Sequence, residues 1–67
     1  MTFNHAVRTF DVKGDMLYEE FFKTADRAYE EYTGIIKLLN KKLDKGEVIY
    51  VARYSEGYLM TVEKIEK

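Results

Sequence analysis

Apolar side chains recur at helical spacing through the middle of the chain, between residues 16 and 43. They fall into three columns whose members are seven residues apart: Tyr18, Ala25, Tyr32 and Leu39; Phe21, Ala28 and Ile35; Phe22, Tyr29, Ile36 and Leu43. Three adjacent columns make an apolar stripe that is wide enough to face a core, and wider than the seam of a coiled coil. The pattern therefore predicts one long helix that packs against another layer.

The ends of this segment carry residues that are typical of helix termini. Asp15 is a candidate N-cap, and Gly46 is suited to the left-handed position that often follows a last turn. Acidic residues are concentrated in the first half and lysines in the second, which favours the helix macrodipole. Gly34 lies on the polar face, so the apolar columns continue through it, and we favour one continuous helix over two.

The segments on either side alternate with the period of β-strands. Residues 2–13 are rich in β-forming side chains and predict one strand, with apolar residues on both faces; a bulge near Arg8, or coverage of both faces, would explain this. Residues 47–67 predict a hairpin whose strands are joined by a three-residue turn, 55–57. In that register the face toward the helix carries Val48, Tyr50, Ala52, Tyr54, Tyr58, Met60 and Val62. A two-residue turn, Glu56-Gly57, would split this set between the faces.

The predicted fold class is α+β, with a β-α-β-β order in a single domain over residues 1–67. One long helix packs on a three-stranded sheet, for which two strand orders are open. We favour the fully antiparallel order, with the first strand beside the last, because small sheets are more often antiparallel. Pairing of the first strand with the second would be parallel and would need a right-handed crossover.

The predicted elements leave apolar residues uncovered. A helix from residue 15 to 44 would be roughly 45 Å long, whereas hairpin strands of about eight residues span roughly 27 Å, so one helix end would overhang the sheet. The helix also covers only one sheet face, and exposed apolar patches often mark interfaces. We therefore predict an interface on the outer sheet face, formed by Phe3, Val7, Ile49, Val51, Arg53, Leu59, Thr61 and Ile65, with Phe10 and Val12 as the alternative contribution of the first strand in place of Phe3 and Val7. An acidic helix surface would face a partner through Glu19, Glu20, Asp26, Glu30 and Glu31.

Composition adds a reason to expect association. The chain has 67 residues, no cysteine and a formal charge of −1. A domain of this length buries only about 60% of the surface of its unfolded chain and usually needs a further stabilising element. Disulfides are excluded, and a lone histidine, His5, makes a metal site improbable, so we expect no metal or cofactor. The stabilising element that remains is a second copy of the chain, in a homodimer, or a tightly bound protein partner.

Catalytic constellations are not evident in the sequence. Ser55, the only serine, lies in the predicted turn, and a catalytic triad would need His5 to reach it across the fold. The acidic pairs Glu19-Glu20 and Glu30-Glu31 would diverge by about 100° on a helix, so neither pair converges on a substrate. The four glycines form no phosphate-binding loop. We therefore expect a protein that is not an enzyme.

Binding of another protein is the function that these patterns favour, and six tyrosines suit such an interface. The alternative is a nucleic-acid-binding regulator that uses Lys37, Lys41, Lys42 and Lys45, although the net charge weighs against it. No apolar run is long enough to span a membrane as a helix, and we expect a cytoplasmic protein. In size the chain is similar to short phage and mobile-element products, which implies an inhibitor or regulator of a larger host protein.

Overall fold

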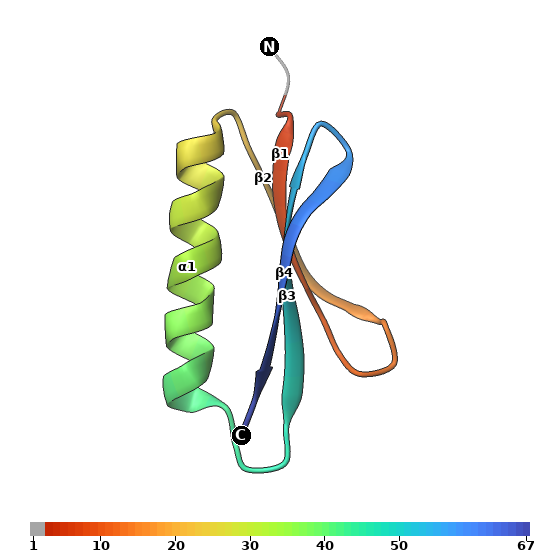
Figure 1. The fold of residues 1–67 in the computed structure, drawn as a ribbon, viewed down its shortest axis with the longest axis vertical. Coiled ribbons are helices and arrows are strands. Elements are labelled where there is room, and N and C mark those ends of the chain that lie inside the picture. The colour runs from red at the N-terminus through yellow and green to blue at the C-terminus, as the bar shows by residue number, and fades with distance from the viewer. Residues whose placement is uncertain (1–2) are drawn as a thin grey trace.

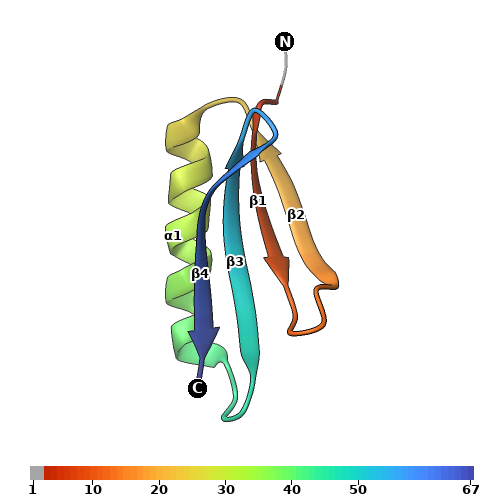
Figure 2. The same cartoon turned by 45° about the vertical axis from the view of Figure 1, so that its right-hand side comes forward.

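Two β-hairpins joined by one helix build the fold (Figure 1). The computed structural model describes residues 3–67. Its elements are β1 (His5–Phe10), β2 (Met16–Phe22), α1 (Ala25–Lys42), β3 (Val48–Ser55) and β4 (Tyr58–Glu66). All neighbouring strands are antiparallel and the sheet order is β2-β1-β3-β4, so β2 and β4 form the edges (Figure 2). The helix lies along one face of this sheet (Figure 1).

The α+β class, the single helix and the antiparallel sheet are confirmed, but the sheet has four strands rather than three. The favoured strand order is wrong, because β1 pairs with β3 and not with the last strand. This pair is antiparallel because the unexpected strand β2 reverses the chain before the helix begins. The first strand is also shorter than the predicted range 2–13, because β1 begins at His5 and ends at Phe10. Thr2 lies outside the described residues.

The segment Met16–Phe22 is a strand, which corrects the predicted start of the helix. Asp15 is not an N-cap, because residues 11–15 form the turn between β1 and β2. The carboxylate of Asp11 accepts hydrogen bonds from the backbone N–H groups of Lys13 and Asp15 at 2.9 and 3.0 Å. Aromatic side chains suit a strand, and this segment pairs along most of β1. Tertiary pairing therefore overrides the helical spacing here.

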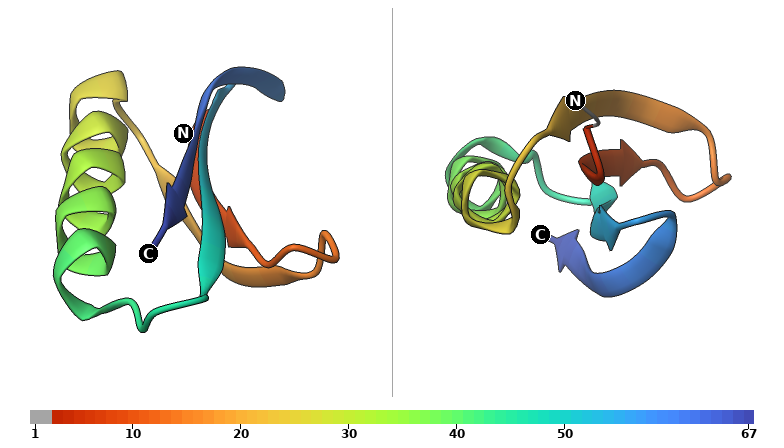
Figure 3. Two further views of the ribbon diagram at one scale, coloured as in Figure 1. Left: turned by 60° about the horizontal axis from the view of Figure 1, so that its bottom comes forward. Right: turned by 90° about the horizontal axis from the view of Figure 1, so that it is seen from above.

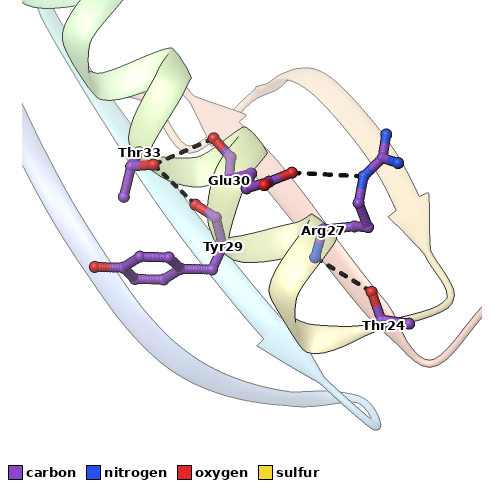
Figure 4. Close-up of polar contacts among 5 residues, drawn as sticks. All are labelled: Thr24, Arg27, Tyr29, Glu30 and Thr33. Carbon is purple, nitrogen blue, oxygen red and sulfur yellow. Dashed lines mark hydrogen bonds and ion pairs between the residues drawn. The ribbon is translucent and has the colours of Figure 1, made fainter.

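Thr24 is the residue that begins the helix. Its Oγ1 accepts a hydrogen bond from the backbone N–H of Arg27 at 3.2 Å, which satisfies one of the free donors of the first turn (Figure 4). The helix then continues through Gly34 to Lys42, as predicted. Its 18 residues span about 27 Å. Since β3 and β4 have eight and nine residues, helix and sheet match in length, and the predicted overhang is wrong.

The core lies between α1 and the sheet face that it covers. Val7 and Val51 are fully buried on the two central strands. They contact a helix surface that includes the buried Ala28 and Tyr32. The partly buried apolar residues around them are Tyr18, Phe22, Ile35, Ile36, Leu39, Leu43 and Ile49, with Ile65 buried on β4. The second half of the predicted apolar stripe, which lies on α1, therefore packs against the sheet as expected.

The face of the last hairpin that packs on the helix is the opposite of the predicted one. Its turn has two residues, Glu56 and Gly57, with φ values of 52° and 85°, which is the backbone of a type I′ turn. A bulge follows in β4, where Met60 has no partner between the pairs Tyr54–Leu59 and Arg53–Thr61. Small valines beneath the helix let it approach the sheet closely, whereas tyrosines there would hold it away.

Candidate functional site

The sheet face that points away from α1 is covered by no other helix or strand of residues 3–67 (Figure 3). We call it the open face. Strand pairing arranges its side chains in three rows that cross the sheet from β2 to β4: Phe21, Ala6, Tyr54 and Leu59; Glu19, Arg8, Ala52 and Val62; Met16, Phe10, Tyr50 and Lys64. Apart from Glu19, Arg8 and Lys64, every member of these rows is apolar or aromatic.

Large apolar side chains of the open face are in contact with solvent. Phe21, Leu59, Val62 and Met16 are each about half exposed. Small residues lie at the centre, where Ala6 and Ala52 are only 4% and 2% exposed because larger neighbours surround them. Monomeric proteins rarely expose a contiguous apolar patch of this kind without a functional reason. The open face is therefore the candidate functional surface.

Arg8 is held firmly in the middle row. Its Nε donates to Oε2 of Glu19 at 2.6 Å, and the two side chains are about one-quarter exposed. The guanidinium carbon lies 4.4 Å from the ring centroid of Tyr54 and 5.9 Å from that of Phe21. Ion pairing and cation–π contacts together fix the rotamer of the arginine and of both rings. The side chains at the centre of the open face therefore hold one another in place.

Two cavities flank the sheet on opposite sides. One, of about 390 Å³, lies at the end of the open face near the β3–β4 turn and is lined by Phe3, Arg8, Phe21, Tyr54 and Glu56, among others. The other, of about 340 Å³, lies between α1 and the β1–β2 half of the sheet, and its lining is mainly apolar. Only the first belongs to the open face.

Tyr18 connects the edge strand β2 to the helix. Its hydroxyl lies 2.6 Å from Oε2 of Glu31 and 3.0 Å from Oε1 of Glu20, and its single proton can be donated to one of them at a time. Burial, followed by these two carboxylates, raises the pKa of Tyr18 well above its usual value of 10. The residue therefore stays a neutral phenol at physiological pH and acts as a structural donor.

Most of the predicted interface residues do not lie on the open face. Val7, Val51 and Ile65 are buried beneath the helix, and Ile49 is partly buried there. The prediction that placed them on the outer sheet face is wrong, because β3 presents its odd-numbered residues to the helix. Leu59 alone among the eight belongs to one of the rows of the open face.

The remaining three residues of that set are separated from one another. Arg53 is on the helix side, with its guanidinium carbon 5.7 Å from the ring centroid of Tyr29. Within residues 3–67 its buried Nε has no hydrogen-bond partner. Thr61 pairs with Arg53 across the strands and is exposed. Phe3 lies before β1, at the cavity of the open face.

The acidic residues predicted for one helix surface lie on two elements. Glu19 and Glu20 are on β2, where they point to opposite faces of the sheet: Glu19 to Arg8 and Glu20 to the helix side. Asp26, Glu30 and Glu31 are on α1, and Glu31 contacts Tyr18. The five carboxylates therefore do not form a common surface, and the predicted acidic helix surface is wrong for its first two members.

The lysines of the nucleic-acid alternative lie away from the aromatic rows. Lys37, Lys41 and Lys42 are exposed on α1, and Lys45 follows in the turn before β3. Since α1 and the open face lie on opposite sides of the sheet, a base stacked on the open face would be far from these charges (Figure 1). The structure thus separates the two features on which such binding would depend.

His5 and Ser55 are brought together, although sequence reasoning placed the serine in a turn. They are direct partners in the β1–β3 register, and Ser55 Oγ lies 3.0 Å from His5 Nδ1. In the described part of the chain no carboxylate is hydrogen-bonded to this imidazole, so the contact is a cross-strand pair and not a triad. Over the same residues, no group of three or more metal-binding side chains converges.

Among residues 3–67, no helix combines the length and the apolar character needed to cross a membrane. Comparison with models of protein families, with curated proteins and with solved structures finds no match to this chain. Its function therefore has to be inferred from the open face itself.

Proposed function

We propose that this chain is a small, non-enzymatic protein-binding module, and that the open face is its contact surface. The observation that carries this proposal is the concentration of aromatic and aliphatic side chains in the three rows, with Phe21, Leu59 and Val62 about half exposed. Covering such a surface removes apolar area from water, at about 25 cal/mol per Å². Tyrosine and arginine, the residues most enriched at binding hot spots, lie at its centre.

A protein partner fits the charges of this surface better than a nucleic acid does. Both cations of the open face have carboxylate partners: Arg8 pairs with Glu19 at 2.6 Å and Lys64 with Glu66 at 3.7 Å. Paired cations offer little to a phosphate backbone, which is bound by free lysines and arginines. An apolar centre with a few fixed, paired charges is the composition of a protein interface.

A module of this size would act by occupying a surface of its partner. It has room for one face of contact and, in our proposal, no chemistry of its own. Its effect would therefore be regulatory, as an inhibitor or as an adaptor, and would depend on how much of the partner it covers. Self-association is the second part of the proposal, because the same apolar face suits a second copy.

A photo-cross-linking amino acid introduced at Val62, on the open face, tests the contact surface. The matched control carries it at Lys37, an exposed position on α1. After irradiation in lysate of the native host, we expect covalent protein adducts from position 62 and few from position 37. Excess unlabelled wild type should suppress the adducts, whereas excess Val62→Glu should not. Equal labelling at both positions would show that the open face is not the contact surface.

A further inference from the structure

We infer that the open face pairs with the open face of a second copy of this chain, about a two-fold axis that runs parallel to the strands, between β1 and β3. This inference rests on the proposed function, because it assigns an occupant to the same surface. The axis lays β2 of one copy over β4 of its partner, and β1 over β3. Shape, side-chain size and charge each favour this arrangement.

The sheet is twisted, and its two hairpin tips lie on the side away from the helix (Figures 1 and 3). The β1–β2 tip and the β3–β4 tip are at opposite ends of the strands and on opposite edges of the sheet. The two corners of the sheet at the hairpin tips bend toward the partner, and the other two corners bend away from it. Rotation about an axis along the strands places each corner that bends toward the partner opposite a partner corner that bends away. Two twisted faces related in this way stay at an even distance, as the sheets of a β-sandwich do.

In the first and middle rows, side-chain sizes of the two central columns complement each other under this rotation, whereas in the third row Phe10 faces the partner's Tyr50. In the first row, Tyr54 on β3 faces the partner's Ala6 on β1. In the middle row, Arg8 on β1 faces the partner's Ala52 on β3. Each contact occurs twice because the axis is two-fold. The two largest side chains of these rows thus meet the two smallest, which allows close packing at the centre.

A second two-fold axis in the plane of the interface is conceivable, running across the strands through the middle row. The charges of the open face favour the axis along the strands over this alternative. The axis across the strands would stack each strand on its own copy, so Glu19 would face the partner's Glu19 and Arg8 the partner's Arg8. Like charges in contact cost free energy in a desolvated interface. With the axis along the strands, Glu19 faces the partner's Val62, and no like charges in the three rows are opposed.

The size of the face sets the expected strength of the dimer. Four strands spaced by about 4.8 Å, and rows that span about six residues, give a patch of roughly 20 Å by 20 Å. A standard stable interface buries about 800 Å² of accessible surface on each partner, and a patch of this size lies at or below that area. We therefore expect a reversible dimer with a dissociation constant in the micromolar range.

Thiol cross-linking of the double variant Glu19→Cys/Val62→Cys with a short bis-maleimide tests the arrangement. The chain has no cysteine of its own, so any cross-link must join the introduced residues. Across the proposed axis these two positions face each other, and sheets packed face to face are about 10 Å apart, which is too far for a direct disulfide but within reach of this reagent. Within one copy the two positions are on the two edge strands, and a cross-link between them would not join two chains. At micromolar concentration we expect a covalent dimer from the double variant and none from either single variant.

Each other outcome overturns the inference in a recognisable way. Cross-linking of Glu19→Cys alone would indicate the axis across the strands. Absence of cross-links, together with sedimentation of the wild type as a monomer, would show that no second copy binds here. Adducts of other proteins from position 62 would then still uphold the proposed function. If circular dichroism shows that the double variant does not fold, Phe21→Cys/Leu59→Cys tests the same pairing in the first row.

Discussion

Tyr18 shows how single polar contacts fix the relation between helix and sheet. Its hydroxyl joins β2 to α1 through Glu31, at the edge of a core that is otherwise apolar. The same residue belongs to a helical column in the sequence, where it would be an ordinary core tyrosine. Its two carboxylate neighbours come from different elements, so this environment arises only when the strand and the helix are in place.

Replacement of Tyr18 by phenylalanine should change how stability depends on pH. The folded state holds the proton of Tyr18 more tightly than the unfolded chain does, because its pKa is raised from 10. This contribution is complete below about pH 10 and is lost as pH rises further, when the unfolded chain ionises. Tyr18→Phe should cost about 1 kcal/mol at pH 7, and its stability should fall less steeply above pH 10.

Urea denaturation between about pH 7 and pH 11 measures both effects. Tyr58→Phe is the matched control, because Tyr58 is 75% exposed. We expect this control to follow the wild type at every pH. Identical pH profiles for the Tyr18 and Tyr58 variants would contradict the role given to the contact with Glu31.

At the scale of elements, the helix α1 and the last hairpin could be predicted from the sequence, because each has a strong local period. The strand Met16–Phe22 could not, since Tyr18 and Phe22 also fit the helical columns. What makes this segment a strand is its pairing with β1, a contact that no local pattern contains. Thr24, a good N-cap residue, was the one local signal for a later helix start.

The face of the hairpin that packs on the helix was also beyond local patterns. Both alternating sets of β3 contain large apolar or aromatic residues, so the sequence offers Ile49 and Val51 as readily as Tyr50 and Tyr54. The choice depends on the two-residue turn, the bulge at Met60 and the closeness of the helix. An uncovered apolar face was nevertheless predictable, because one helix covers only one side of a sheet.

Two glycines provide a matched test of backbone conformation. Gly34 lies inside the helix and Gly46 has a φ of 92°, and a Cβ on either would meet no atom within 4 Å. Gly34→Ala should therefore stabilise the protein by about 0.5–1 kcal/mol, because alanine is the better helix former. Gly46→Ala should destabilise it by about 1 kcal/mol or more, because a side chain disfavours that φ. Chemical denaturation measures both, and effects of the same sign would contradict the assigned conformations.

For the whole molecule, the decisive property is that a largely apolar sheet face is left without a helix. By strand register the charges of the open face are Glu19, Arg8, Lys64 and Glu66, and these form two ion pairs among apolar and aromatic side chains. A chain of 67 residues with no disulfide buries little area, so an open apolar face is costly to leave in water. Contact with another protein would offset that cost.

Sedimentation velocity over about 1–200 µM tests this most directly, with wild type, Val62→Glu and Lys37→Glu compared. Val62 is 52% exposed, so the carboxylate of Val62→Glu stays in water in the monomer and does not disturb its fold. In a dimer the same carboxylate would be buried without a partner, which destabilises the contact. We predict that the wild type and Lys37→Glu shift from monomer toward dimer as concentration rises, while Val62→Glu remains a monomer. Equal association of all three proteins, or monomers throughout, would contradict the assignment of the open face as the surface on which copies of this chain meet.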